Sequence, residues 1–147
     1  MDIKIRKATV EDLPTVFNLV KEFATYLGKI EKVKTTPDEF KQQMDYFTCL
    51  IAENSKDEIV GYALFSTLFH TWSGKSIYLD DLYVKDEYRR SSVGTMLVCG
   101  LIDYAKHKKV KYLNWQVLNW NESAINFYRK MGATVGDDNL NCSFTIQ

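Results

Sequence analysis

The sequence predicts an α/β fold in which one mixed sheet carries helices on both faces. Segments with strand-like alternation and segments with helical spacing of apolar residues follow one another along 147 residues. Three strand-like runs in the middle of the chain are separated only by polar turns, which predicts antiparallel neighbours. The last of these runs is joined to the next strand-like run through a helix, which predicts a parallel pair with a right-handed crossover. The length fits one domain, residues 1–147.

The N-terminal third predicts one strand and two helices. Residues 2–7 alternate polar and apolar side chains, as expected of a first strand. An apolar stripe from about Val10 to Tyr26 predicts a helix, with Thr9 as its capping residue. Residues 36–39 read Thr-Pro-Asp-Glu, a capping box with proline at the first helical position, so a second, shorter helix follows.

The rest of the chain supplies most of the predicted sheet. Strand-like runs at residues 48–53, 59–69 and 78–84 form a predicted antiparallel meander. The remaining expected elements are a helix at 93–108, a strand at 112–117, a helix at 121–131 and short final strands at 133–135 and 143–146.

Composition excludes several classes of protein. Nineteen Lys and Arg residues balance nineteen Asp and Glu residues, so no overall positive field draws the chain to nucleic acid or to an anionic membrane. No apolar run approaches the roughly 18 residues of a membrane helix. The N-terminus lacks the apolar segment of a signal peptide, so we expect an intracellular, cytoplasmic protein.

The cysteines and histidines predict neither a disulfide nor a metal site. The three cysteines lack C-x-x-C spacing, and two of them lie in predicted core elements, so buried free thiols are a better interpretation than nucleophiles. The two histidines lie far apart and match no zinc-ligand pattern.

Residues 77–97 form a stretch that predicts strand, tight basic loop and helix. The helix begins with small residues that follow Arg89 and Arg90. Its first turn therefore offers free backbone N–H groups and the positive end of the helix dipole. This arrangement indicates an anion site, with phosphate as the expected anion.

Two motifs show a resemblance to a known superfamily. Residues 89–94, Arg-Arg-Ser-Ser-Val-Gly, correspond to the signature of Arg or Gln, two residues, Gly, one residue, then Gly or Ala. With the stretch Trp-Asn-Glu-x-x-Ile-Asn-Phe-Tyr at residues 120–128, the chain resembles the GCN5-related N-acetyltransferase (GNAT) superfamily, and within it the spermidine/spermine and thialysine acetyltransferases. The resemblance implies a six- to seven-stranded, mostly antiparallel mixed sheet in which the fourth and fifth strands are parallel and splay apart.

The resemblance also implies that acetyl-CoA is the cofactor. Its pantetheine arm is expected to pair with the 82–84 backbone, and its pyrophosphate to rest on N–H groups of residues 89–95. The signature glycine is replaced by Ser92, and Arg90 stands where the polyamine branch often has glycine. Glycine permits close approach and unusual dihedrals, so these two positions bear on cofactor affinity. The expected cofactor-binding residues are Leu82, Tyr83, Val84, Arg89, Arg90, Ser91, Ser92, Val93, Gly94, Thr95, Asn121, Ser123, Ala124 and Tyr128.

Acetyl transfer to an amine needs a base for the amine and a proton for the departing thiolate. The resemblance implies that Tyr128 donates that proton, although an amphipathic helix alone would explain Tyr128 as a core aromatic. Asp80 takes the position of a branch glutamate, and because its side chain is shorter we expect it to act as a base through a bridging water. Alternation places Asp80 and Asp81 on opposite faces of a strand unless a bulge intervenes.

The resemblance implies an amine site that includes Tyr26, Trp72, Asp80 and Asp81. His70 stands where polyamine enzymes have an aspartate, so an amino acid such as thialysine or lysine is as plausible an acceptor as spermidine. The resemblance further implies a homodimer.

The leading hypothesis is thus an acetyl-CoA-dependent N-acetyltransferase that acts on the primary amine of a small molecule by direct attack in a ternary complex. An alternative is a catalytically degenerate relative that binds CoA or a partner without acetyl transfer. A third hypothesis, a protein N-terminal or histone acetyltransferase, would need a peptide groove of which the sequence gives no sign.

Overall fold

A computed structural model describes residues 2–136 and 139–146. The chain divides into two compact units, Met1–Trp115 and Gln116–Gln147. The first unit contains the sheet and three of the helices, and the second contains the last helix.

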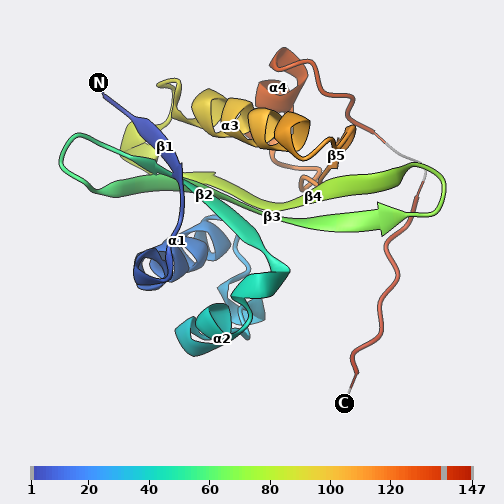
Figure 1. Cartoon of the computed structure of the whole chain (residues 1–147), viewed down its shortest axis with the longest axis horizontal. Helices are drawn as coiled ribbons and strands as arrows, with labels where there is room; N and C mark the ends of the chain where they lie inside the picture. The colour runs from blue at the N-terminus through green and yellow to red at the C-terminus, as the bar shows by residue number, and fades with distance from the viewer. Residues whose placement is uncertain (1, 137–138, 147) are drawn as a thin grey trace. The chain divides into compact units, whose positions relative to one another are not determined.

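The sheet of the first unit has five strands in the order β1-β2-β3-β4-β5 (Figure 1). Strands β1 to β4 form antiparallel neighbours, which confirms the predicted meander, and β4 pairs with β5 in parallel, which confirms the predicted parallel pair. The strands are β1 Lys4–Lys7, β2 Thr48–Glu53, β3 Ile59–His70, β4 Gly74–Val84 and β5 Tyr112–Asn114.

Helices cover both faces of this sheet. The helices of the first unit are α1 Leu13–Tyr26, α2 Pro37–Gln42 and α3 Val93–His107. Helices α1 and α2 lie on one face and α3 on the other (Figure 1). A 3₁₀ turn, Val10–Asp12, precedes α1, so the helix predicted from Val10 begins with a tighter turn. The predicted cap of α2 is confirmed, because the Glu39 backbone N–H donates to Thr36 Oγ1 over 3.1 Å.

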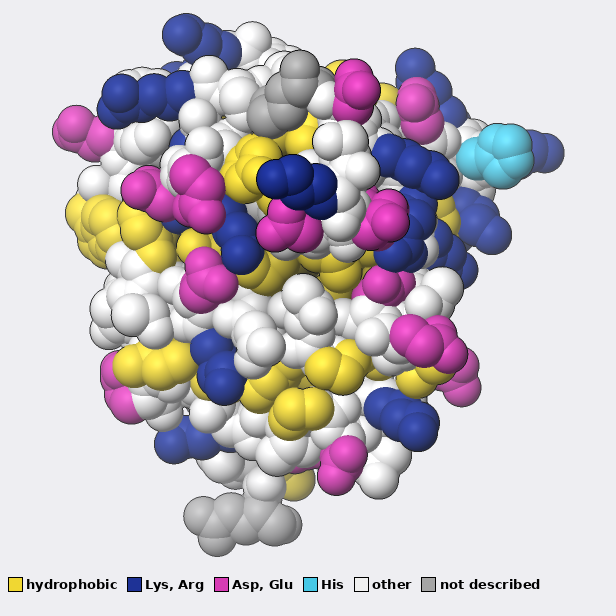
Figure 2. Space-filling model, turned by 90° about the vertical axis from the view of Figure 1, so that its left-hand side faces the viewer, with side chains coloured by type: hydrophobic (Ala, Val, Ile, Leu, Met, Phe, Trp, Pro, Cys, Tyr) yellow, Lys and Arg dark blue, Asp and Glu magenta, His cyan; other side chains and the backbone are white. Residues whose placement is uncertain are grey.

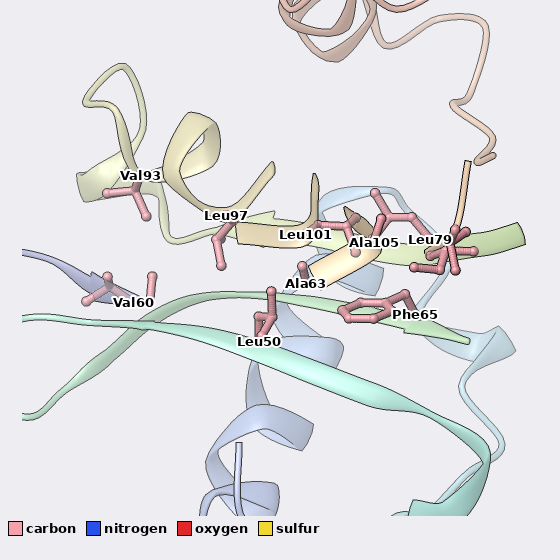
Figure 3. Packing of buried hydrophobic residues seen from close by; sticks show 12 residues of the cluster. Leu50, Val60, Ala63, Phe65, Leu79, Val93, Leu97, Leu101 and Ala105 are labelled. Atoms are coloured by element: carbon pink, nitrogen blue, oxygen red, sulfur yellow. The ribbon is translucent and has the colours of Figure 1, made fainter. Parts of the chain in front are cut away.

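Each face of the sheet has its own apolar core. On one face Val60, Ala63 and Phe65 pack against Leu97 and its neighbours in α3 (Figure 3). The other face buries residues of β2, β3 and β4 with α1, and the largest wholly buried side chain there is Tyr62. Burial on both faces explains why β2 and the first part of β3 are almost continuously apolar.

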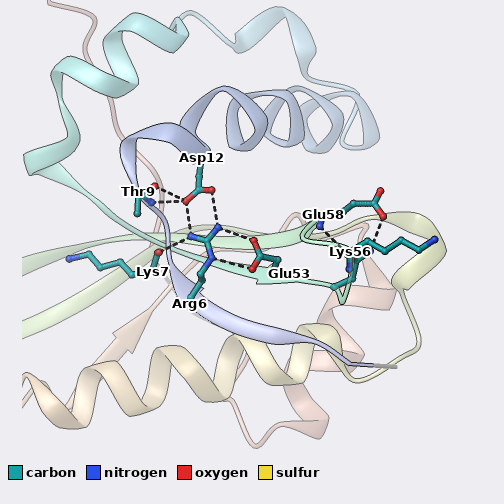
Figure 4. A network of polar contacts seen from close by, with 8 residues as sticks. Arg6, Lys7, Thr9, Asp12, Glu53, Lys56 and Glu58 are labelled. Carbon is teal, nitrogen blue, oxygen red and sulfur yellow. Dashed lines mark hydrogen bonds and ion pairs between the residues drawn. The ribbon is translucent and has the colours of Figure 1, made fainter.

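Arg6 joins the N-terminal strand to its neighbours by ion pairs (Figure 4). Its guanidinium donates to Asp12 at 2.8 and 3.0 Å and to Glu53 at 2.9 Å. Asp12 also accepts from the backbone N–H of Thr9 at 2.7 Å. The contacts with Arg6 and Thr9 lower the pKa of Asp12 to about 2.

Three expectations about single segments are wrong. Residues 133–135 and 143–146 form no strand, so the described residues hold five strands rather than six or seven. Phe144 and Ile146 are 95% and 89% exposed. Alternation predicts which face a strand would bury, but a strand also needs a partner edge, which a local pattern does not reveal.

Strand β5 ends at Asn114 instead of residue 117, because its ladder with β4 covers only Ser76 to Tyr78. Of the cysteines in predicted core elements, Cys49 is buried but Cys99 is exposed on α3. The helix turns that residue away from the stripe formed by Val93, Leu97 and Leu101.

The surface agrees with the balanced charge of the sequence. Figure 2 shows acidic and basic side chains interspersed on the face that it displays. In the part of the chain that the structure describes, no helix is long and apolar enough to cross a membrane. Within the same residues, no cluster of three His, Cys, Asp or Glu side chains is placed to hold a metal ion.

Candidate active site

A bulge in β4 brings two neighbouring carboxylates to the same side of the sheet. Leu64 of β3 pairs with Asp81, but the next residue, Phe65, pairs with Leu79. Asp80 is therefore an extra residue in the ladder, which breaks the regular alternation of β4. The sequence predicted opposite faces for Asp80 and Asp81 unless a bulge intervened, and the structure contains that bulge.

The two carboxylates line a cavity of about 570 Å³. The wall opposite them comes from α1, from the loop that follows it and from α2, including Phe23 and Phe40. Three basic residues of that loop, Lys29, Lys32 and Lys34, lie on the same cavity. An apolar hollow with acidic groups on one element and basic groups on another suits a small, charged organic molecule.

Asp81 is the more buried of the two aspartates. It accepts a hydrogen bond of 2.6 Å from the hydroxyl of Tyr62, whereas Asp80 is exposed to solvent. Burial, opposed by the Tyr62 hydrogen bond, raises the pKa of Asp81 to about 6. Partial desolvation also raises the pKa of Asp80. Both shifts move carboxylates toward the range in which they exchange protons near neutral pH.

The start of α3 has the geometry of an anion site. The first helical hydrogen bond runs from the Met96 N–H to the Ser92 carbonyl over 2.8 Å. The N–H groups of Val93, Gly94 and Thr95 therefore lie in the first turn of the helix and make no helical hydrogen bond to a preceding carbonyl. The turn before them is fixed by the Ser91 hydroxyl, which donates to the Tyr88 carbonyl. These amides suit a phosphate.

The unusual backbone of this loop falls at Arg90 and not at Ser92. Arg90 has φ of 61°, in the left-handed region, whereas Ser92 has φ of −56°. Glycine is favoured only in the first of these conformations. Ser92 therefore imposes no backbone strain at the signature position.

Arg89 is turned toward the protein instead of extending from the loop. Its Nε donates to the Val84 carbonyl at 2.9 Å, and its Nη1 donates to Asp86 at 3.2 Å. Its guanidinium also stacks on Tyr26 and Tyr83, with 4.5 and 5.3 Å from Cζ to the ring centres. Arg89 thus fixes the end of β4 to the loop.

The edge of β4 that faces β5 is paired only along part of its length. The ladder ends at Tyr78 and Asn114, yet β4 continues to Val84. The backbone of the later residues on that edge is left to pair with another extended chain. This is the stretch that includes Leu82 and Tyr83.

The second unit holds the remaining expected residues on one helix, α4, Glu122–Lys130. Asn121 caps that helix, because its side chain accepts from the Ala124 N–H at 3.3 Å. Ser123 and Ala124 lie in its first turn. Phe127 packs edge-on against Tyr128, and burial raises the pKa of Tyr128 to about 12. The phenol is therefore protonated over the physiological range.

Two expected amine-site residues lie elsewhere in the first unit. Trp72, at the tip of the β3–β4 hairpin, is 98% exposed. Tyr26 lies against Arg89, and neither aromatic residue lines the cavity. Tyr62 was not predicted from the sequence, because an isolated tyrosine in an apolar run gives no indication of its carboxylate partner.

The comparisons with known proteins identify the family and support the fold. Residues 13–133 match the model of the acetyltransferase (GNAT) family. The thialysine N-epsilon-acetyltransferase of Bos taurus is 31% identical, over 89% of this chain and 84% of the relative. The spermidine/spermine N(1)-acetyltransferase-like protein 1 of Homo sapiens is 28% identical over 88% of this chain, but over only 20% of its own length.

A solved structure supports the fold. The crystal structure of an aminoglycoside acetyltransferase from an uncultured soil metagenomic sample, in complex with sisomicin, superposes with a TM-score of 0.82. It covers 99% of this chain and 97% of its own, at 19% sequence identity. From the family match and the similarity to the bovine relative, the chain belongs to the acetyltransferase (GNAT) family.

Proposed function

We propose that the protein is an N-acetyltransferase that transfers acetyl from acetyl-CoA to the primary amine of a small molecule by direct attack in a ternary complex. The observation that carries this proposal is the bulge at Asp80, which gives one cavity two carboxylates. The same strand leads directly into the anion site at the start of α3. The two carboxylates for an amine and the loop for a phosphate would therefore lie on and next to one strand.

The residues of the first unit fit acetyl-CoA. When bound, the cofactor supplies the acetyl group as a thioester. The N–H groups of Val93, Gly94 and Thr95 would hold its pyrophosphate, with charge from Arg90. The unpaired edge of β4 at Leu82 and Tyr83 would hold its pantetheine arm.

Asp80 and Asp81 would prepare the amine for attack. A primary amine is mostly an ammonium ion at neutral pH, since its pKa is about 10. It must lose a proton before its nitrogen can attack a carbonyl carbon. Asp80 is exposed to solvent, so we assign it the role of base through a bridging water.

Tyr128 would return a proton to the departing thiolate. Burial keeps its phenol protonated, as this role requires. The thiol Cys49 is buried and has its pKa raised to about 12, so an acyl-enzyme on this residue is disfavoured and direct attack is preferred.

The charges on the cavity favour an amino acid over a polyamine as acceptor. Lys29, Lys32 and Lys34 would repel the second ammonium group of a polycation and attract a carboxylate. Thialysine, the amino acid in the name of the bovine relative, has this combination of groups. We also propose a homodimer in the cytoplasm, by resemblance to the branch, which light scattering and cell fractionation would test.

The test is thiol release from acetyl-CoA with a panel of lysine, ornithine, cadaverine and spermidine. We expect turnover with at least one amine, and a loss of about 10²–10³-fold in kcat for Tyr128→Phe. Calorimetry with acetyl-CoA separates catalysis from binding. Tight binding without turnover of any amine would favour the degenerate alternative.

A further inference from the structure

Tyr62 is a wholly buried tyrosine whose hydroxyl contacts Asp81, a residue that lines the cavity. It pairs with Tyr83 across the β3–β4 ladder, so Asp81 is its diagonal neighbour on the same face. The hydroxyl lies 2.6 Å from Asp81 Oδ2, and Tyr62 itself has no exposed surface. Asp81 lines the cavity, whereas Tyr62 lies behind it.

We infer that Tyr62 is a positioning residue of the amine site, which holds Asp81 charged and oriented so that Asp81 is the carboxylate that binds the ammonium group of the acceptor. The inference rests on the proposed function. The two aspartates then have different roles, because Asp81 binds the ammonium group of the acceptor and Asp80 accepts its proton.

The geometry supports this division. A carboxylate can accept a hydrogen bond from a phenol without giving up its charge, and such charge-assisted bonds are the stronger kind. The bond fixes one oxygen of Asp81 and leaves the other for a ligand. Asp80 is the inserted residue of the bulge, with no cross-strand pair to fix it. The fixed carboxylate of Asp81 therefore suits binding of the amine, and the less constrained carboxylate of Asp80 suits proton transfer.

The groups around Asp81 act on its charge in opposite directions. Burial and the neighbouring Asp80 favour the protonated acid, and the Tyr62 hydroxyl favours the carboxylate. Cys49 of β2, on the same face, is a neutral thiol. The other charged groups on the cavity are Lys29, Lys32, Lys34 and Glu39. Loss of the Tyr62 hydroxyl therefore raises the pKa of Asp81.

The direct test is a pH titration of protein labelled with ¹³C at its aspartate carboxyls. One resonance should titrate near pH 6 and be absent in Asp81→Asn. In Tyr62→Phe it should titrate higher by at least about 0.5 in pH. Tyr83→Phe is the matched control, since it removes a neighbouring hydroxyl that donates to Glu22 and should leave this resonance in place. An unchanged titration in Tyr62→Phe overturns the inference.

The kinetic test uses the best amine of the panel at pH 6.5. Tyr62→Phe should raise the KM for the amine about tenfold, with the KM for acetyl-CoA unchanged and kcat within about a factor of two. A fall in kcat with an unchanged amine KM would contradict an anchoring role. If Tyr62→Phe does not fold, an Asp81 resonance that titrates above about pH 8 in the unaltered protein overturns the inference, because Asp81 would then be uncharged at neutral pH.

The titration also separates this inference from the proposed function. If no amine is acetylated, the proposed function fails, whereas the Tyr62 effect on Asp81 is still measured by the titration. If amines are acetylated but Asp81→Asn leaves the amine KM unchanged, only the role of Asp81 as the anchor fails.

Discussion

The ring of Tyr26 covers the guanidinium of Arg89, with 4.5 Å between the ring centre and Arg89 Cζ. Tyr26 is the last residue of α1, and Arg89 precedes the loop that starts α3. The contact therefore joins the end of α1 to the loop before α3 within the first unit.

Tyr26→Ala should loosen the loop that follows Arg89. We expect acetyl-CoA to bind about three- to tenfold more weakly and the free energy of unfolding to fall by about 0.5–1 kcal/mol, the strength of an exposed cation–π contact. Tyr26→Phe keeps the ring and should match the unaltered protein. Calorimetry and urea unfolding measure both quantities, and equal cofactor affinity in Tyr26→Ala would contradict a role for this contact.

Arg90 should tolerate glycine better than alanine. Its φ of 61° costs an L-residue roughly 1 kcal/mol, and glycine avoids that cost. Both variants remove the same charged side chain, so the difference between their free energies of unfolding reports the cost of the backbone conformation. We expect Arg90→Gly to be more stable than Arg90→Ala by about 0.5–1 kcal/mol in urea unfolding. Equal stability would mean that the loop adopts another conformation in solution.

Ser92→Gly should change cofactor affinity little. Ser92 has φ of −56°, which serine adopts without strain, so no conformational gain is expected from glycine. We expect the dissociation constant for acetyl-CoA to remain within about threefold, measured by calorimetry. A gain of tenfold or more would show that the serine side chain obstructs the pyrophosphate.

Asp12→Asn should destabilise the protein in a pH-dependent way. Contacts with Arg6 and Thr9 hold the pKa of Asp12 at about 2, below its unfolded value. The stabilisation is therefore complete above about pH 4 and is lost as the pH falls toward 2. We expect the free energy of unfolding to drop by about 1–2 kcal/mol at pH 7, with a shrinking difference below pH 4.

Urea unfolding at several pH values checks this prediction. Glu11→Gln removes the same charge at the preceding, exposed residue and serves as the control. A loss of stability in Asp12→Asn that is constant from pH 7 to pH 2 would be at odds with the ion pair as its cause.

Gly61→Ala should destabilise the sheet more than Gly100→Ala. A Cβ at residue 61 would lie 2.8 Å from the Tyr83 carbonyl oxygen and 3.3 Å from Leu97 Cδ1. At residue 100 it would meet only side-chain atoms, the nearest being Ile5 Cγ2 at 3.1 Å, and that side chain can move. We expect a loss of about 1–3 kcal/mol for the first variant. Because alanine favours helices, we expect less than about 1 kcal/mol for the second. Thermal unfolding compares the two.

Much of the fold follows from local sequence patterns. The caps at Thr9 and Thr36, the meander and the parallel pair depend on residue spacing and short turns, and the structure contains each of them. Strand lengths and the final strands depend on which edges find partners, and those pairings are not local.

The site was less predictable than the fold. The bulge at Asp80 is a property of the β3–β4 register. From the sequence we could predict only that a bulge, if present, would let Asp80 and Asp81 face the same side of the sheet. The Tyr62 contact depends on the same register. The expected role of Tyr26 came from the resemblance to the branch, and in the structure its ring lies against Arg89 and does not line the cavity.

The inserted residue in β4 also has a consequence for the divergence of such proteins. Asp80 contributes no cross-strand pair, so a change of its side chain disturbs the ladder less than a change at a paired position. Chemistry at this point can therefore vary while the sheet persists. A single extra residue gives the strand a position at which the side chain can change at little cost to folding.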